Sequence, residues 1–485
     1  MPVSLHKKNY LQLLCVCLCG FGLAWHIIHK AFTVSFTHDE AYTYTHYLHQ
    51  GFMDIVSYKT PYTNNHILNT VLMKYSEVFF GSSEIALRLP NILAFIVYSL
   101  FAVLLLYTHC RKFLLPCYLL LTLNPYLLDF FALARGYGLS IAFLMMSVYY
   151  LSRFYISRKT IHLILFNAGA FLAVMSNFSL LNYYVAVLII HNLLEFYIHK
   201  KSYHFFQTNK INIVAVIISG MVLYEPLRRI SKMNLLDFGG KNGFLEDTVG
   251  TAIYSLFYEA HVPDLYMGIL KSTILLVVIF TSGLIIFKLA QKDNLFFRSN
   301  TILTLCNLVL LAIAGITILQ HLLMGNDYYV HRFALFFYPL FMLNFIFLIC
   351  FVSQKVSLKI PLLSCYLIVS LLIYNLYINH NLIYFKDWKQ DRPIKNIMQV
   401  LVSEHEKQPD KQIRLGINWL FEPVTNFYRY TWDLKWMNPT HRRGLSKYDD
   451  YILIFKHDKE FESVSTKPVL YSDELTGIVL LKNRN

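Results

Sequence analysis

The sequence predicts a mainly α-helical, polytopic membrane protein, with about eleven transmembrane helices and a small α/β domain at its C-terminal end. Three observations predict this class. Hydrophobic residues make up 56% of the chain, whereas ordinary soluble domains contain roughly 45–50% apolar residues. Apolar segments long enough to cross a bilayer as helices recur along the first 379 residues. Lys and Arg fall mainly in every second loop between these segments, as expected for a protein with one cytoplasmic face.

Eleven apolar segments are predicted as membrane-spanning helices. In lipid, backbone polar groups must be satisfied within the segment, which favours helices over isolated strands. The segments cover about residues 10–30, 86–107, 113–129, 136–153, 161–178, 181–198, 211–226, 267–288, 301–323, 333–352 and 360–379. Those at 113–129 and 211–226 are short, so a count between 10 and 13 fits the sequence.

The charge distribution predicts the orientation. Fifteen Lys and Arg residues lie in loops of one face, which is therefore predicted to be cytoplasmic. The protein is therefore predicted to lie in the inner (cytoplasmic) membrane. Its N-terminus is predicted to be cytoplasmic and its C-terminal region extracytoplasmic. The net charge of +14 mostly reflects this bias. It does not indicate a nucleic-acid partner, which would require basic residues clustered on one soluble face.

Two outer loops are long enough to have structure of their own. Residues 31–85 contain amphipathic stretches at 39–50 and 66–80, predicted as short helices lying along the membrane interface. Residues 227–266 form a second outer loop with a helix-like stretch at 248–261. With the spans, these loops make up a transmembrane domain over residues 1–379.

Residues 380–485 are predicted to form a separate extracytoplasmic domain. This region contains 31 charged residues among 106, whereas the other 379 residues contain 41. The higher density of charge indicates a domain exposed to water. Its pattern predicts short strands at 412–418, 451–455 and 477–481 and helices near 393–405 and 422–430, hence a small α/β fold.

The strongest local signal is the segment Thr37-His38-Asp39-Glu40-Ala41-Tyr42, directly after the first span. Charges at the edge of a bilayer are costly unless they are paired, solvated or used. One interpretation is chemistry at the membrane surface. The other is that Thr37 and Asp39 cap an interfacial helix, for which both residue types are suitable.

Cationic candidates lie at the outer ends of two other spans. Arg135 and Tyr137 open the fourth span, close in sequence to Asp129 at the end of the third. A guanidinium suits phosphate oxygens, but Arg135 is equally suited to reach the interface and pair with Asp129. Arg332, at the mouth of the tenth span, is either a second phosphate ligand or an ordinary helix-end arginine. Arg88 opens the second span and is interpreted only as its anchor.

Three motifs carry a family resemblance. They are Thr37–Tyr42, the segment Ser83-Glu84-Ile85-Ala86-Leu87-Arg88-Leu89-Pro90, and Ala134-Arg135-Gly136-Tyr137-Gly138-Leu139. In this order and spacing they resemble bacterial polytopic glycosyltransferases of the C-type fold, similar to protein O-mannosyltransferases and to the lipid A aminoarabinose transferases. The resemblance covers residues 1 to about 350.

The resemblance implies an inverting transfer of a sugar from a polyprenyl phosphate to a glycan, lipid or protein acceptor on the extracytoplasmic face. It places Asp39 at the catalytic position, where the carboxylate either removes a proton or orients a metal ion and the acceptor. Glu40 and Asp129 complete the acidic set. Only a divalent metal ion is implied as a cofactor.

Two histidines are candidate metal or phosphate ligands. His66 stands in Asn64-Asn65-His66, where relatives often carry Lys-Pro-Pro or Glu-Lys, so this chain departs from the family pattern. His261 corresponds to a loop histidine that binds metal in the aminoarabinose transferases. A lone histidine at an interface is also commonly a surface or hydrogen-bonded residue.

The alternatives make different predictions. An enzyme requires Asp39, His66, Asp129 and His261 to converge. A transporter or flippase would place ionisable residues near the bilayer midplane, and Glu195 and Glu225, within or near spans, keep that alternative open. A non-catalytic assembly protein would not need the acidic pair.

Overall fold

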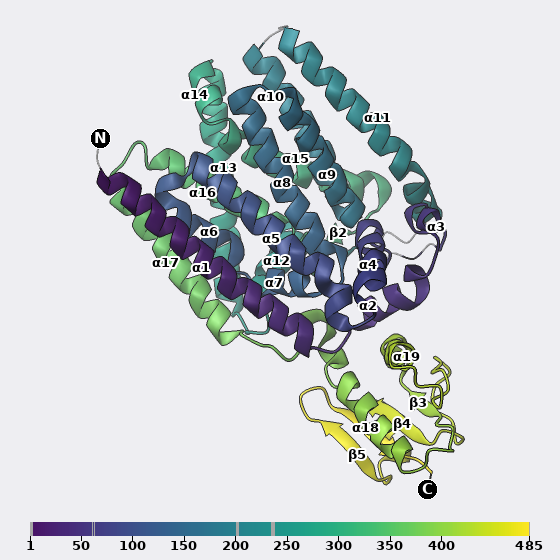
Figure 1. Cartoon of the computed structure of the whole chain (residues 1–485). Coiled ribbons are helices and arrows are strands. Elements are labelled where there is room, and N and C mark those ends of the chain that lie inside the picture. Colours follow the sequence, from purple (N-terminus) through teal and green to yellow (C-terminus); the bar gives the residue numbers. More distant parts are fainter. Residues whose placement is uncertain (1–2, 61, 63, 200–202, 234–237, 485) are drawn as a thin grey trace.

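The computed structural model describes residues 3–60, 62, 64–199, 203–233 and 238–484. They form a bundle of long helices with a small α/β domain at one end, which we call the domain end (Figure 1). Within the described residues, nine helices are long and apolar enough to cross a membrane. The predicted class, a mainly α-helical multi-pass membrane protein, is confirmed.

Nine of the eleven predicted spans are confirmed as long apolar helical segments, two of which begin with a 3₁₀ turn, before α10 and before α16. The helices that contain them are α1 (Val3–Thr33), α5 (Glu84–His109), α8 (Gly136–Ser157), α10 (Leu181–His199), α11 (Tyr203–Lys232), α13 (Asp264–Ala290), α15 (Thr301–Met324), α16 (Phe337–Val352) and α17 (Lys359–Ile378). The segment predicted to be short at 211–226 belongs to α11, which is long enough to span.

The other two predicted spans differ from single long helices. The segment at 161–178 forms α9 (Thr160–Ser176), a shorter apolar helix. The segment at 113–129 is not one span, because α6 (Leu114–Thr122) and α7 (Pro125–Ala132) meet at a bend of 71°. Pro125 lacks an N–H and opens α7, while the Asn124 side chain accepts from the next two backbone N–H groups. The two residues stop one helix and start the next.

The first outer loop contains the predicted helices, but one of them is not on the surface. The stretch at 66–80 forms α4 (Ile67–Phe80), with exposed apolar side chains including Phe79 and Phe80, as expected at an interface. The stretch at 39–50 forms α2 (His38–Thr43) and a π-helical turn, η1 (Tyr44–Leu48). Instead of lying in the interface, α2 is covered by the C-terminal domain.

The second outer loop is shorter than predicted, because α11 continues to Lys232. The helix-like stretch at 248–261 forms a π-helical turn, η4 (Phe244–Gly250), and α12, which ends early (Thr251–Leu256). Strand β1 (Gly239–Gly240) pairs with β2 (Tyr328–Tyr329), which ties this loop to the segment before α16.

The C-terminal domain is the predicted α/β unit, built after α17 ends at Ile378. Its elements are η6 (Lys386–Asp391), α18 (Ile394–Glu406), β3 (Leu415–Ile417), η7 (Trp419–Phe421), α19 (Glu422–Thr431), β4 (Tyr451–Phe455), α20 (Phe461–Val464), β5 (Val469–Asp473) and β6 (Ile478–Lys482). The sheet has the order β3-β4-β6-β5, with β3 parallel to β4. Sequence reasoning missed β5, an edge strand with only one fully buried residue, Asp473, and no clear alternation of apolar side chains.

The domain and the first outer loop share one hydrophobic core. Phe36, Tyr44 and Leu87 of the transmembrane unit are buried in the same cluster as the core of the domain. Phe36 stacks on Phe427 at a ring distance of 4.1 Å, and its N–H donates to the Tyr428 hydroxyl at 2.8 Å. The domain is therefore part of the fold around α2, although its sequence has the charge density of an independent unit.

A buried ion pair holds the elements of the domain end together. Glu40 and Arg88 are both fully buried, and the Arg88 guanidinium donates to both Glu40 oxygens, at 2.8 and 2.7 Å. The same carboxylate accepts from the backbone N–H of Thr37 at 2.9 Å and of Ala134 at 2.6 Å. Arg88 donates further to the carbonyls of three residues at the end of α1, Ala31, Val34 and Ser35. Arg88 therefore does more than anchor its helix.

We expect Glu40→Gln to destabilise the protein by about 3–5 kcal/mol, because it leaves a buried guanidinium without its counter-charge. Thermal unfolding of the purified protein would show this as a clear fall in Tm. A matched control is Glu225→Gln, at a partly exposed carboxylate that pairs with Arg228 and Arg229. Equal melting temperatures for Glu40→Gln and the wild-type protein would contradict the role of the pair.

Candidate active site

Asp39 lies in the first turn of α2, between the buried residues Thr37 and Glu40. Thr37 caps this helix, and its side chain and that of Glu40 form a reciprocal capping box. Capping was one interpretation of the acidic pair, and it holds for Glu40. Asp39 is not used by the cap: its carboxylate lies 3.4 Å from the Arg135 guanidinium and 3.9 Å from that of Arg332.

Arg135 is held by the turn that opens α8. Its side chain is 3% exposed, and one terminal nitrogen donates to the Thr43 hydroxyl at 3.3 Å and to the Asn64 carbonyl at 3.1 Å. The next residue, Gly136, packs against the Ser176 carbonyl and the side chain of His66 so closely that no Cβ fits there. The glycine thus lets Arg135 and His66 approach each other.

Arg332 enters from the other side of the bundle, in the turn η5 (His331–Ala334) before α16. Its guanidinium lies 3.5 Å from the Asp387 carboxylate and stacks over the Trp388 ring at 5.3 Å. The Tyr126 hydroxyl donates to the same Asp387 oxygen at 2.7 Å. The segment after the last span thereby fixes the position of Arg332.

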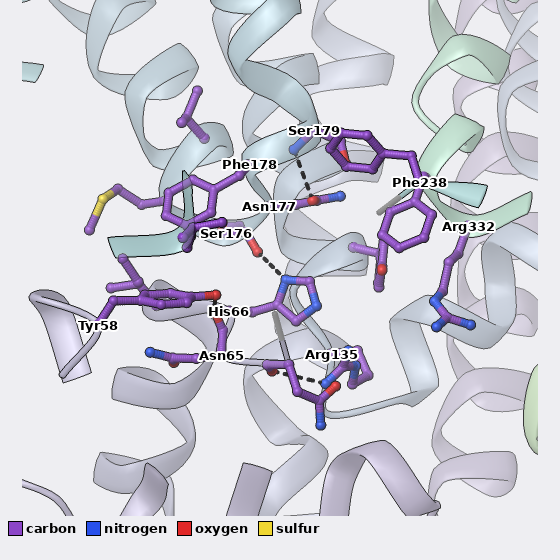
Figure 2. A pocket seen from close by; sticks show the side chains of 17 residues that line it. Tyr58, Asn65, His66, Arg135, Ser176, Asn177, Phe178, Ser179, Phe238 and Arg332 are labelled. Atoms are coloured by element: carbon purple, nitrogen blue, oxygen red, sulfur yellow. Dashed lines mark hydrogen bonds between the residues drawn. The ribbon is translucent and has the colours of Figure 1, made fainter. Parts of the chain in front are cut away.

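A polar recess of about 80 Å³ lies beside these groups. Its lining includes Asn64, His66, Arg135, Tyr137, Asn177 and Arg332, several of which Figure 2 shows around the His66 ring. His66 Nδ1 donates to the Ser176 carbonyl at 2.9 Å, since that carbonyl can only accept. Nε2 is then an acceptor, buried and without a hydrogen-bond partner among the described residues.

The electrostatics of the recess favour an anion. Burial raises the pKa of Asp39, but the guanidiniums of Arg135 and Arg332 outweigh this effect and hold the pKa below its ordinary value. Burial, followed by the charge of Arg135, lowers the pKa of His66 well below its ordinary value. At neutral pH one carboxylate and a neutral imidazole therefore face two guanidiniums. Both guanidiniums line the recess, whereas Asp39 and Asp387, which pair with them, do not, so the recess presents cationic donors to a phosphate.

The structure brings together five of the predicted site residues and places the others elsewhere. Asp39, His66, Arg135, Tyr137 and Arg332 surround the recess or contact its lining. Glu40 belongs to the buried pair with Arg88. The exposed His261 lies outside the recess, as do Glu40 and Asp129.

Asp129 does not pair with Arg135, which corrects one of the two interpretations of Arg135. Its carboxylate lies 2.5 Å from the Lys30 ammonium and accepts from the Tyr258 hydroxyl at 2.5 Å. It also accepts from the backbone N–H of Lys386 at 3.1 Å. Asp129 thus connects α1 and the second outer loop to the residue before Asp387.

Sequence reasoning missed the contribution of the segment from Lys386 to Arg392. The Trp388 side chain helps to lower the pKa of Asp39, and Asp391 accepts from the His38 backbone N–H at 2.6 Å. Burial and the nearby charges of Asp39 and Glu40 raise the pKa of Asp391 well above its ordinary value. The available signal was the density of charged residues immediately after the last span, in Lys386-Asp387-Trp388-Lys389-Gln390-Asp391-Arg392.

The donor set around the recess does not fit a divalent metal ion. Among the described residues, no group of three His, Cys, Asp or Glu side chains could hold one. The unpartnered nitrogen of His66 shares its recess with two guanidiniums, which repel a cation. His66 and His261 remain metal candidates from the sequence only.

Comparisons with known proteins give matches of fold only. No protein-family model matches the sequence, and the curated proteins give no significant match. Among solved structures, ArnT from Cupriavidus metallidurans bound to undecaprenyl phosphate is 10% identical, with 96% of this chain and 98% of that chain covered and a TM-score of 0.45. The apo state of the same protein is 9% identical, with 96% and 97% covered and a TM-score of 0.41.

We expect Gly136→Ala to lower stability by about 1–3 kcal/mol, because the added methyl group overpacks the contact with Ser176 and His66. Thermal unfolding measures the effect. The control is Gly283→Ala in α13, where a Cβ meets nothing within 4 Å. If both variants melt at the wild-type temperature, the close approach at Gly136 is not needed to build the recess.

Proposed function

We propose that the protein is a membrane glycosyltransferase of the C-type fold, which moves a sugar from a polyprenyl phosphate to an acceptor hydroxyl at the domain end, on the extracytoplasmic side. One observation carries the proposal: a carboxylate, Asp39, lies between two guanidiniums at the edge of a cationic recess. An acid for the acceptor and cations for the departing phosphate are the two groups that such a transfer needs. The three sequence motifs that resemble this class supply Asp39, Arg88 and Arg135.

The proposed step is a single displacement. The acceptor oxygen bonds to the anomeric carbon as the bond from that carbon to the phosphate oxygen breaks, and the polyprenyl phosphate leaves with the electron pair. Asp39 accepts the hydroxyl hydrogen bond and takes the proton, which then passes to water. Arg135 and Arg332 stabilise the charge that develops on the phosphate.

The same two guanidiniums link donor binding to the strength of the base. They lie near the Asp39 carboxylate and lower its pKa, which makes it a weak base. A bound phosphate competes for Arg135 and Arg332 and weakens this effect. The pKa of Asp39 then rises only when a donor is bound, so the base is activated only when a sugar can be transferred.

An apolar cavity of about 700 Å³ supports a lipid donor. It lies between η4, α12, α13, α15 and α16 and is lined almost entirely by apolar side chains. Ala252 lines it, and the neighbouring Thr251 accepts from the backbone N–H of His331, the residue before Arg332. We propose that the isoprenoid tail occupies this cavity while its phosphate reaches Arg332.

Asp39→Asn tests the proposal directly. Removal of a general base typically costs 10²–10⁴-fold in rate, so we expect a loss of this size per folded molecule, together with a fall in Tm because the buried Arg135 loses its carboxylate partner. The assay follows radiolabel from polyprenyl phosphate sugars to an acceptor fraction in membranes that contain the protein. Full transfer by the variant would remove Asp39 from the mechanism, and movement of the intact donor across the membrane without bond cleavage would favour a transporter.

The pH profile gives a second test. A carboxylate whose pKa lies below about 3.9 stays ionised throughout the range from pH 5 to 8, and His66, with its lowered pKa, stays neutral there. We therefore expect kcat/KM, which reports the free enzyme, to show no acidic limb in this range. A limb with an apparent pKa near 6.5 would indicate an essential histidine that titrates and would contradict the assignment.

Donor chain length tests the cavity. Ala314→Trp places a large ring in the cavity lining, so we expect it to raise KM for an undecaprenyl donor several-fold but not for a donor with only two isoprene units. The matched control is Leu319→Trp, on the exposed side of the same helix. Equal effects of Ala314→Trp on both donors would place the tail elsewhere.

A further inference from the structure

A cluster of aromatic side chains lies next to Asp39 and has no part in the proposed phosphate chemistry. It consists of His38, Tyr42, His46 and Tyr62 from the first outer loop and Trp419 from the C-terminal domain, and we call it the aromatic patch. Trp419 is 55% exposed and Tyr62 is 50% exposed. Single exposed aromatic side chains are common, but a contiguous exposed patch of them indicates a binding surface.

The patch is continuous from one unit to the other. The rings of His38 and Trp419 meet edge to face at 6.3 Å. Tyr42 stacks on His46 at 4.0 Å with nearly parallel planes, and the Tyr62 ring stands against Tyr42 at 6.1 Å. His38 is fixed in place, because its Nδ1 donates to the Leu420 carbonyl at 2.7 Å.

The aromatic patch and the recess lie against adjacent faces of α2. His38 and Tyr42 are four residues apart and share one face, and Asp39 and Thr43 share the next face, about 100° away. The second face contacts Arg135, through the carboxylate of Asp39 and the hydroxyl of Thr43. A molecule on the patch therefore reaches Asp39 from a different direction than a phosphate bound by Arg135.

Charged groups edge the patch on the side of the C-terminal domain. The Arg442 guanidinium lies 5.6 Å above the Trp419 ring and 3.3 Å from the Glu422 carboxylate. Both side chains retain contact with solvent. The surface thus combines flat apolar rings with hydrogen-bonding groups at their edge.

We propose that the aromatic patch binds a saccharide, and that the acceptor of the transfer is therefore a glycan; the second statement rests on the proposed function. A pyranose ring presents C–H groups on its faces and hydroxyls around its rim. The faces match the rings of Trp419, Tyr42 and Tyr62, and the rim matches Glu422 and Arg442. A sugar bound there extends a hydroxyl to Asp39, on the adjacent face of α2.

Saturation-transfer difference NMR tests binding on the full-length protein in lipid nanodiscs, prepared without sugar detergents. The probes are maltotriose, cellotriose and chitotriose, with a serine- and threonine-rich tripeptide as the alternative acceptor. We expect difference signals from at least one trisaccharide, at least fivefold weaker in Trp419→Ala, and none from the tripeptide. Tyr62→Leu, which keeps an apolar side chain, gives a second weakened variant.

The matched control is Tyr448→Ala. Tyr448 is 53% exposed and has Arg484 5.3 Å above its ring, as Trp419 has Arg442. Trp419 also meets the ring of His38 from the first outer loop, whereas the cations over Tyr448, Lys447 and Arg484, belong to its own domain. We expect wild-type signals from this variant, and wild-type melting temperatures for all three variants.

Each other outcome overturns the inference: no signal from any trisaccharide, an undiminished signal in Trp419→Ala, or a tripeptide signal that Trp419→Ala abolishes. The assay contains no donor, so it is independent of the transfer reaction. Sugar binding without radiolabel transfer would contradict only the proposed function. Transfer that depends on Asp39, without sugar binding to the patch, would contradict only this inference.

Discussion

The buried pair of Glu40 and Arg88 is the constraint on which the domain end depends. An isolated charge would not be tolerated at this depth, and the pair persists because every strong donor and acceptor in it has a partner. Its partners are the end of α1, the start of α2 and the backbone of Ala134. Asp39 follows the cap of α2, and Arg135 follows Ala134. One interaction therefore positions both the acid and the first guanidinium of the candidate site.

The second guanidinium depends on a different set of contacts. Asp387 holds Arg332, and the backbone next to it is fixed by Asp129, which is itself paired with Lys30. The first network lies within residues 31–135, whereas the second joins this part of the chain to Arg332 and Asp387. Their charges balance within each network, but Arg135 and Arg332 keep donors available toward the recess. This arrangement gives a stable cationic surface without an unpaired charge in the protein core.

Nine of the spans, and five residues that the structure brings together at the recess, could be predicted because the signals are local: apolar length, alternating loop charge and short motifs at helix ends. The sequence did not predict the pairing of Glu40 with Arg88 or of Asp129 with Lys30, since these join segments 48 and 99 residues apart. The bend at Pro125 has a local cause, but a continuous apolar segment concealed it. Asp387 and Trp388 were missed because charge density alone indicates a water-facing region and does not show which side chains turn back toward the bundle.

The core shared by the first outer loop and the C-terminal domain has a consequence for biogenesis. Ribosomes make the helix bundle first, and the residues that cover α2 and position Arg332 are synthesised only after the last span. A nascent chain already inserted in the bilayer thus carries Asp39 without the partners that arrange its surroundings. The candidate site is therefore completed late, when residues 380–485 dock, and products of incomplete translation lack the side chains that position Arg332.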